Sequence, residues 1–373
     1  MRLKAGLIVC GLLAAINVQA KMYYGPTPNV STQQEYELPS GAPADVYLWK
    51  EDYPGTSGYY DAVGTYKCAY SDVQQTCSHQ SGRSTITIVL KEKRSGMTHS
   101  LKLQAYMTGI KYNNADPSQS ESCNARYALN NQTYLSCSTS SWSIVDNARV
   151  LTAWIPQSEM NNLPVGGVWE GALKLQYNAA GRTPVNFVAN ITLKGKATGK
   201  QDIFFPEFNN ANPLVQLDLH PTGAITGNSF AEDVTTLDMC LYDGYNSNSD
   251  SMKLSFADEN KGGASRKNGY YSIYNTGTAG TGENERIDYR LEMFNPHTKS
   301  WMRVDNGQGY DISAGVNGQD QVRPVHLPSI SYPVLCAPAP LRLIVDKFRV
   351  TDKTAGYYKG TLQVYFSPSL NSI

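Results

Sequence analysis

The cysteines are the residues whose spacing most directly predicts chemistry in this sequence, namely disulfide formation. Seven are present. Cys10 lies in an apolar N-terminal stretch, and the others form two closely spaced pairs followed by two distant residues. This spacing favours local bonds first. We therefore predict the disulfides Cys68–Cys77, Cys123–Cys137 and Cys240–Cys336. The chain has neither a C-x-x-C motif nor a nearby His pair, so a structural metal site is not predicted.

Residues suited to catalysis are present but not grouped. The histidines are scattered, and there is no H-E-x-x-H motif or nucleophile elbow. The glycine-rich stretch 277–282 is interpreted as a surface loop, because no helix follows it. Asp243, Asn246, Asn248 and Asp250 are spaced like calcium ligands, but no bidentate Glu follows at the required distance. We predict no enzymatic activity, cofactor or metal, with a secreted carbohydrate-active enzyme as the least favoured alternative.

The composition and the N-terminus indicate an exported protein. Lys and Arg number 32, as do Asp and Glu, so the formal net charge is +0 and no nucleic-acid partner is expected. Arg2 and Lys4 precede the apolar run 5–16, and Val18-Gln-Ala20 fits a small-residue cleavage site. The run is too short to span a bilayer. We predict a signal peptide over residues 1–20, removed during export to an oxidising compartment.

Period-2 alternation of apolar residues predicts β-strands throughout the mature chain. In the first half we expect a hairpin of 85–90 and 101–106, a polar loop at 111–124, one helical turn at 156–160, and strands at 150–154, 169–177 and 184–193. In the second half we expect strands at 214–219, 270–274, 288–294, 322–327, 341–350 and 360–366. The short segment 195–200 separates the predicted strands of the first half from those of the second half. The sequence predicts two immunoglobulin-like β-sandwiches, with a first domain at 21–197, a linker at 198–199 and a second domain at 200–373.

Two stretches of the second half carry the most specific patterns. In residues 237–257, Leu237, Met239 and Leu241 alternate with polar residues, a turn follows, and the alternation resumes at 252–256. We interpret this stretch as two strands of a hairpin. Near the C-terminus, Leu362, Val364 and Phe366 would share one face of the last strand.

Several sequence segments resemble those of the CblD-like family of minor tip adhesins and assembly initiators of alpha-class (class 5) chaperone–usher fimbriae. The resemblance covers nearly the whole mature chain and is strongest in its C-terminal half. The matching phrases are Asp238-Met-Cys-Leu-Tyr-Asp-Gly-Tyr-Asn-Ser-Asn-Ser249, Leu327-Pro-Ser-Ile-Ser-Tyr-Pro-Val-Leu-Cys336, Gly356-Tyr-Tyr-Lys-Gly-Thr-Leu-Gln-Val-Tyr-Phe-Ser-Pro-Ser369, Asn162-Leu-Pro-Val-Gly-Gly-Val-Trp-Glu170, Asn190-Ile-Thr-Leu-Lys194 and Pro221-Thr-Gly223.

The resemblance implies how the second domain would work. A pilin sandwich of this family lacks its seventh strand, so a groove would border the last strand, here the one with Leu362, Val364 and Phe366. The implied partners are a periplasmic chaperone, an outer-membrane usher, and the major pilin, whose N-terminal strand fills the groove by β-augmentation. The implied location is the extracellular fimbrium tip, reached through the periplasm of a Gram-negative bacterium. The same resemblance implies the disulfide pairing given above.

The N-terminal domain would bind a host glycan or glycoprotein receptor. The family uses a basic patch, which this chain matches only in part: Arg182 is the main candidate, with Lys67 and Arg94 as neighbours. Guanidinium groups suit the carboxylate of an anionic sugar. Pro26 and Pro28 remove backbone donors from the mature N-terminus, which makes it a poor donor strand and favours the tip position. The alternative is a structural initiator without receptor binding.

Overall fold

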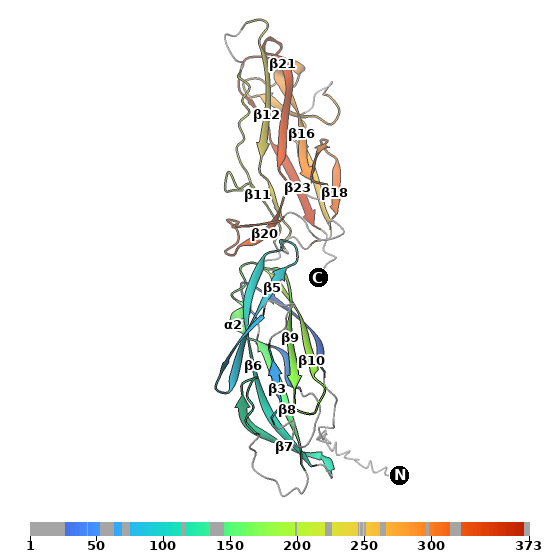
Figure 1. The fold of residues 1–373 in the computed structure, drawn as a ribbon. Coiled ribbons are helices and arrows are strands. Elements are labelled where there is room, and N and C mark those ends of the chain that lie inside the picture. Colours follow the sequence, from blue (N-terminus) through green and yellow to red (C-terminus); the bar gives the residue numbers. More distant parts are fainter. Residues whose placement is uncertain are drawn as a thin grey trace, which may run out of the picture.

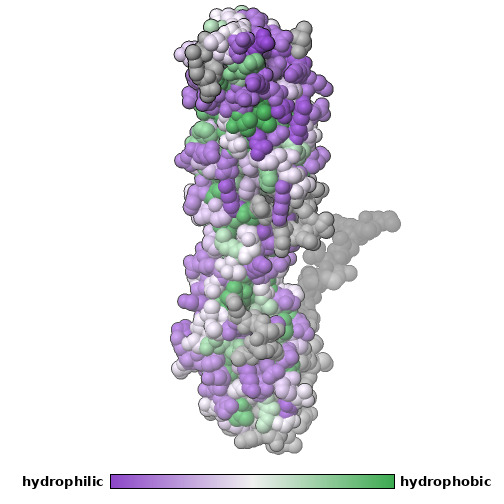
Figure 2. All heavy atoms as spheres, turned by 45° about the horizontal axis from the view of Figure 1, so that its top comes forward, coloured by the Kyte–Doolittle hydropathy of each residue, from purple (hydrophilic) through white to green (hydrophobic). Residues whose placement is uncertain are grey.

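The computed structural model describes residues 27–368, except 43, 53–62, 69–74, 114–115, 135–144, 198–199, 221–225, 245, 247–248, 250, 262–265, 296–297 and 314–321. The predicted signal peptide and linker thus lie outside the described residues. Two β-domains lie end to end in an elongated molecule, with the N-terminal domain at the bottom of Figure 1. On the face in Figure 2, apolar residues form small patches among hydrophilic ones. The predicted all-β fold with two domains is confirmed.

The N-terminal domain consists of one strongly curved sheet. Its strands are β1 (Asn29–Glu37), β2 (Val46–Asp52), β3 (Thr65–Lys67), β4 (Gln75–Gln80), β5 (Arg83–Glu92), β6 (Thr98–Asn113), β7 (Asp116–Tyr127), β8 (Val145–Ile155), β9 (Gly167–Asn178) and β10 (Val185–Lys196). Their order is β1-β10-β9-β5-β6-β8-β2, with β3 beside β9, β4 beside β5 and β7 beside β6. The alternation predicted for β5 is clear, since Ile86, Ile88 and Leu90 are buried in the core that the sheet encloses.

Two local predictions for this domain have different outcomes. The hairpin is confirmed, because β5 and β6 pair antiparallel from Ser84↔Ala105 to Lys91↔Thr98. The polar loop at 111–124 is wrong, because β6 continues to Asn113 and β7 returns alongside it. Main-chain pairing holds this second hairpin together, and its polar side chains give no apolar alternation that sequence reasoning could detect.

Helical structure is sparse. The predicted turn is α2 (Gln157–Met160), and among the described residues the other helices are the 3₁₀ turns η1 (Glu283–Glu285) and η2 (Val350–Asp352). No helix in the described ranges combines the length and the hydropathy that a membrane crossing requires.

The C-terminal domain is a sandwich with an additional small sheet. Its strands are β11 (Asp202–Phe204), β12 (Phe230–Leu237), β13 (Cys240–Tyr242), β14 (Ser251–Asp258), β15 (Tyr271–Asn275), β16 (Arg286–Asn295), β17 (Ser300–Val304), β18 (Gly309–Ser313), β19 (Arg323–Val325), β20 (Val334–Pro338), β21 (Leu341–Arg349), β22 (Tyr358–Lys359) and β23 (Leu362–Pro368). The main sheet has the order β12-β21-β16-β15-β22, with β17 beside β16. The second sheet is β18-β14-β23, and the small one is β11-β13-β20-β19. The main and second sheets share one core, to which Leu291 and Leu341 contribute from one side and Leu254 and Phe256 from the other.

The stretch 237–257 is not the predicted hairpin. β13 pairs with β11 and β20, whereas β14 pairs with β18 and β23. The alternation itself is real, because Met239 and Leu241 point into the main core and Cys240 and Tyr242 into a smaller one. Both faces of β13 are therefore buried, and the chain leaves it for a different sheet instead of folding back.

The loop after β13 reaches the junction between the domains. Asn246 is fully buried and its Oδ1 accepts a hydrogen bond from the Leu335 main-chain N–H at 2.9 Å. Leu335 packs into the N-terminal core although it belongs to the other domain. A Cβ on Gly166 would lie only 2.3 Å from the Asn246 amide nitrogen. The domains are therefore in close contact at this point.

Two of the predicted disulfides are present, Cys68–Cys77 and Cys240–Cys336, with Cα–Cα distances of 6.1 and 5.7 Å. Cys123 is buried and disulfide-bonded. Cys137 lies outside the described residues, so the pairing of Cys123 with Cys137 stays a prediction. The first bond links the end of β3 to β4, and the second links β13 to β20.

The beginning of the described chain is part of its own domain. Strand β1 pairs parallel with β10 over its whole length, from Asn29↔Val188 to Glu37↔Lys196. Tyr36 near its end is buried in the domain core. Residues 29–37 are thus an edge strand of the chain's own sheet.

Candidate functional site

The last strand has one free edge. β23 pairs antiparallel with β14 from Asp258↔Leu362 to Met252↔Pro368, and in the described part of the chain it has no ladder on its other side. Leu362, Val364 and Phe366 are half-buried and pack against the core of the sandwich. An edge that combines unpaired main-chain groups with a partly covered apolar row is suited to receiving another strand.

A second partly covered row lies in the segment 213–220. This segment is extended, but within the described residues it forms no strand ladder. Val215, Leu217 and Leu219 alternate along it and pack against the same core as β23. The Asp218 N–H donates to Asp233 Oδ2 on β12 at 3.2 Å, which keeps the segment beside the main sheet. The apolar core of the C-terminal sandwich is thus only partly covered beside β23 and beside the segment 213–220.

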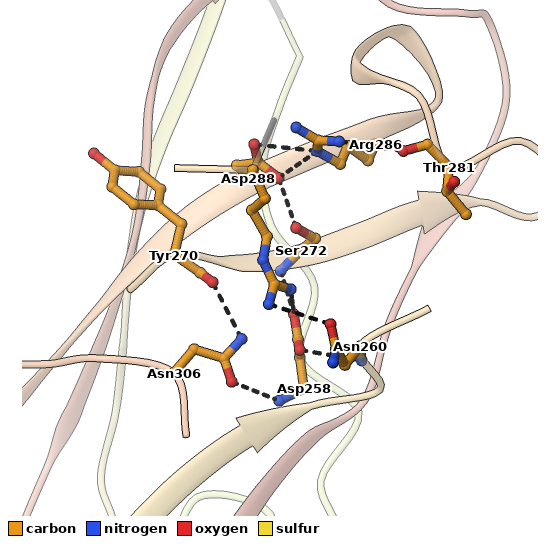
Figure 3. A network of polar contacts seen from close by, with 9 residues as sticks. Asp258, Asn260, Tyr270, Ser272, Thr281, Arg286, Asp288 and Asn306 are labelled. Atoms are coloured by element: carbon orange, nitrogen blue, oxygen red, sulfur yellow. Dashed lines mark hydrogen bonds and ion pairs between the residues drawn. The ribbon is translucent and has the colours of Figure 1, made fainter. Parts of the chain in front are cut away.

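A network of charged and polar side chains fixes the sheet at the beginning of β23 (Figure 3). Asp258, the last residue of β14, binds Arg266 at 2.7 Å and accepts the Ser272 N–H at 2.9 Å. The Ser272 hydroxyl donates to Asp288 Oδ1 at 2.6 Å, and the buried Arg286 donates from Nε to the same oxygen at 3.0 Å. Because these groups satisfy one another, β14 is a rigid edge for β23 to pair with.

A polar pocket of about 470 Å³ opens between β3 and β4 in the N-terminal domain. Gln75 crosses the gap, with its Nε2 donating to Cys68 O at 2.6 Å and to Lys174 O at 2.8 Å. Burial lowers the pKa of His79, so its imidazole is neutral near pH 7. Lys67 is then the one charged group among the lining residues, which are Thr65, Tyr66, Lys67, Cys68, Gln75, Cys77, His79, Asn130 and Gln132.

The three basic candidates do not lie together. Lys67 pairs in register with Gln176, and Arg182 follows the far end of β9, so both lie toward the end remote from the C-terminal domain. Arg94 lies at the opposite end of β9, because the neighbouring Lys93 N–H donates to Val168 O at 2.8 Å. The eight residues of β9 between Val168 and Gln176, at about 3.3 Å each, separate Arg94 from Lys67 by roughly 26 Å. Arg94 is also only 9% exposed. The expectation that it joins Arg182 and Lys67 is therefore wrong.

The described residues contain no group of three His, Cys, Asp or Glu side chains arranged to hold a metal ion. Of the calcium-like residues, Asp243 is buried and accepts the Ser249 N–H at 2.9 Å, and Asn246 binds Leu335. Asn248 and Asp250 lie outside the described residues.

Sequence comparison identifies two family matches that together cover most of the chain. The first domain of the CFA/I fimbrial subunit CfaE matches residues 18–198, and the second domain of the same subunit matches residues 201–370. A curated relative, the CFA/I fimbrial subunit CfaE of Escherichia coli, is 30% identical over 313 residues, which cover 82% of this chain and 77% of the relative.

Solved structures of similar fold are found as well. The crystal structure of the adhesive subunit of CFA/I fimbria of enterotoxigenic Escherichia coli is 24% identical, with a TM-score of 0.66 and coverage of 94% of this chain and 95% of that one. A structure of a chaperone–tip adhesin complex of CFA/I fimbriae is 23% identical, with a TM-score of 0.52 and coverage of 94% and 99%. The two-domain fold of this chain is thus similar to theirs.

Proposed function

The chain belongs to the family of the CFA/I fimbrial subunit CfaE, and from this premise we propose that it is the adhesive tip subunit of a class 5 chaperone–usher fimbria. In this role the C-terminal domain accepts the donor strand of the major pilin, and the N-terminal domain binds a host surface receptor. The family consists of fimbrial subunits and not of enzymes, so the prediction of a non-enzyme is confirmed.

The acceptor role is supported chiefly by one observation, the free edge of β23 beside its half-buried apolar row. A donor strand along this edge would pair with the main chain of β23. Its alternate side chains would cover Leu362, Val364 and Phe366 and reach the row formed by Val215, Leu217 and Leu219. Covering apolar surface in this way is favourable by about 25 cal/mol per Å². The paired position of β1 supports a subunit that accepts a strand without offering one.

The acceptor role is tested with a synthetic peptide that matches the N-terminal strand of the major pilin. A ligand that binds only the folded state raises the melting temperature with its concentration. We expect such a rise with the pilin peptide and none with a scrambled peptide of the same composition. An unchanged melting temperature at saturating peptide would refute the acceptor role.

The same free edge supports the proposed need for a periplasmic chaperone and an outer-membrane usher. An uncovered edge strand with apolar neighbours associates with other exposed strands, so a subunit of this kind requires a temporary partner before assembly. We expect export without the chaperone to give aggregated or degraded protein, measured as the soluble fraction in the periplasm.

The proposed receptor site is the remote end of the N-terminal domain, around the polar pocket. Lys67 lies in the pocket wall and Arg182 on the turn after β9. A small pocket lined by amide, hydroxyl and cationic groups suits the hydroxyl and carboxylate groups of an anionic sugar. The receptor is thus proposed to be a host glycan or glycoprotein.

Receptor binding is tested by red-cell agglutination with Lys67→Gln and Arg182→Gln variants. Both changes remove a charge from accessible side chains, so we expect roughly a tenfold loss of activity, about 1.4 kcal/mol, without a change in fold. Lys347→Gln, which removes the charge of an exposed lysine on β21 of the C-terminal domain, is the matched control. If the unaltered protein binds no cells, the structural initiator without receptor binding replaces the adhesin.

A further inference from the structure

A row of aromatic rings and cations crosses the outer face of the N-terminal sheet. Tyr47 on β2 stacks with Trp154 on β8 at 6.1 Å between centroids, and Trp154 meets Tyr106 on β6 edge-on at 5.8 Å. Lys50 Nζ lies 5.3 Å from the Tyr47 centroid, and the Arg126 guanidinium lies 4.4 Å from the Tyr106 centroid. These five residues, called the aromatic row below, span the neighbouring strands β2, β8, β6 and β7.

The aromatic row does not belong to the domain core. On the same strands, Ala105, Met107 and Ala153 point inward and are fully buried, whereas the aromatic row lies on the opposite face. Tyr47 keeps 46% of its surface exposed, whereas Trp154 and Tyr106 are half-buried. Cross-strand ring pairs stabilise a sheet by a fraction of a kcal/mol each, but large exposed aromatic side chains framed by cations are also typical of binding surfaces.

The aromatic row itself carries two cations, whereas the carboxylates of Asp45 and Glu159 lie near it and accept the main-chain N–H groups of Gln157 and Lys102 at 2.9 and 2.8 Å. Lys50, Lys102 and Arg126 are exposed, and none of them forms a salt bridge with a described residue. The outward positions of β5 and β6 carry no acidic residue. Besides Tyr106 and Lys102, they carry hydroxyl, amide, apolar or basic side chains, namely Arg83, Thr85, Thr87, Val89, Lys91, Ser100, Gln104 and Thr108. The exposed cations can therefore pair with anions, and the hydroxyl and amide groups of this face can donate hydrogen bonds.

We propose that the aromatic row is a second ligand-binding surface, for an acidic oligosaccharide. Sugar rings would stack on Tyr47, Trp154 and Tyr106, while carboxylate or sulfate groups pair with Arg126 and the flanking lysines. Four strands at about 4.8 Å spacing extend over roughly 14 Å, which is longer than one sugar and matches an oligosaccharide. Lys50, Lys102 and Arg126 are exposed, so binding weakens as salt screens their charges.

This site is separate from the pocket proposed for the receptor. The pocket lies between β3 and β4, whereas the aromatic row crosses β2, β8, β6 and β7. The two sites share no residue. Substitutions at Lys67 therefore report on the pocket alone, and substitutions at Trp154 or Arg126 report on the aromatic row alone.

The test measures binding of three defined probes to the full chain by calorimetry at low salt. The probes are a heparin-derived octasaccharide, an octamer of sialic acid, and neutral maltooctaose. We expect at least one acidic probe to bind and maltooctaose to bind at least tenfold more weakly. Trp154→Thr should raise the Kd for the acidic probe roughly tenfold, because a lost ring contact is worth up to about 1.5 kcal/mol. Arg126→Gln should raise it several-fold and reduce its salt dependence.

Matched controls separate binding from folding. Trp301→Thr makes the same change on an outer sheet face of the other domain, where the Arg342 guanidinium lies 3.9 Å from the ring centroid, and should leave the Kd unchanged. Tyr47→Thr repeats the test at a more exposed ring if Trp154→Thr lowers the melting temperature. A sulfate preference or a carboxylate preference identifies the ligand class, and either supports the site.

Three results would overturn the proposal. One is the absence of binding by both acidic probes. Another is acidic binding that Trp154→Thr, Tyr47→Thr and Arg126→Gln leave intact. The third is binding that disappears with Lys67→Gln but not with the row variants, which would assign it to the pocket.

Discussion

Phe366 allows the acceptor proposal to be tested at the level of one side chain. Phe366 on β23 is half-buried in the free protein and packs against the sandwich core. Full burial of a Phe side chain is worth about 1.5–3 kcal/mol relative to exposure. About half of this is already gained in the free protein, so roughly 1 kcal/mol remains to be gained when a donor strand covers the ring.

We therefore expect Phe366→Ala to weaken binding of the major pilin's N-terminal peptide roughly five- to tenfold. The free variant should also lose about 1 kcal/mol or more of unfolding free energy, because the ring already contributes to the core. Peptide affinity is measured by fluorescence anisotropy at a temperature where circular dichroism shows both proteins folded.

The adjacent residue gives the control. Tyr365 points to the other side of β23, is 55% exposed, and donates its hydroxyl hydrogen to Gln363 on the same strand at 2.8 Å. Tyr365→Ala should change the peptide Kd by less than roughly twofold, about 0.4 kcal/mol. Equal weakening by both variants, or none by Phe366→Ala, would refute the idea that the donor covers this face of the strand.

Three further predictions concern stability. Replacing both Cys240 and Cys336 with Ala should lower the unfolding free energy of the C-terminal domain by about 4–5 kcal/mol, because the bond closes a long loop with a sequence separation of 96; a urea melt that matches the unaltered protein would contradict this. The hydrogen bond from Arg290 lowers the pKa of Asp346, so its stabilisation is present above about pH 4 and is lost as the pH falls further. Asp346→Asn should therefore flatten the acid side of the stability curve, and an unchanged slope there would refute the contribution. Gly166→Ala should lower the unfolding free energy by about 1–3 kcal/mol, because the added methyl group overpacks the domain junction. A urea midpoint equal to that of the unaltered protein would contradict this.

The sequence predicted the strands whose two faces differ. β5 and β23 show apolar alternation because one face packs on a core and the other meets solvent, and that contrast is visible in the chain. The sequence did not predict β7, because this strand is held by main-chain pairing and its side chains are polar. The hairpin predicted at 237–257 was wrong for a related reason. Alternation identifies strands but not their partners, and β13 and β14 belong to different sheets.

The candidate sites were predictable to different degrees. The apolar row on β23 followed from its spacing, and residues 214–219 were expected as a strand, although they form no ladder with a described residue. The placement of Arg94 depends on which end of β9 the β5–β6 turn meets, a long-range relation that local pattern does not encode. The aromatic row was missed because its rings come from β2, β6 and β8, which are far apart in the sequence.

The parallel pairing of β1 with β10 has a consequence for copy number. Under the proposed role of strand acceptor, a subunit whose first described strand is committed to its own sheet would be followed by another subunit but would not follow one. Each molecule would then start one fibre and never lengthen an existing one. The amount of this protein made by a cell would set how many fibres it carries, and its ratio to the major pilin would set their mean length.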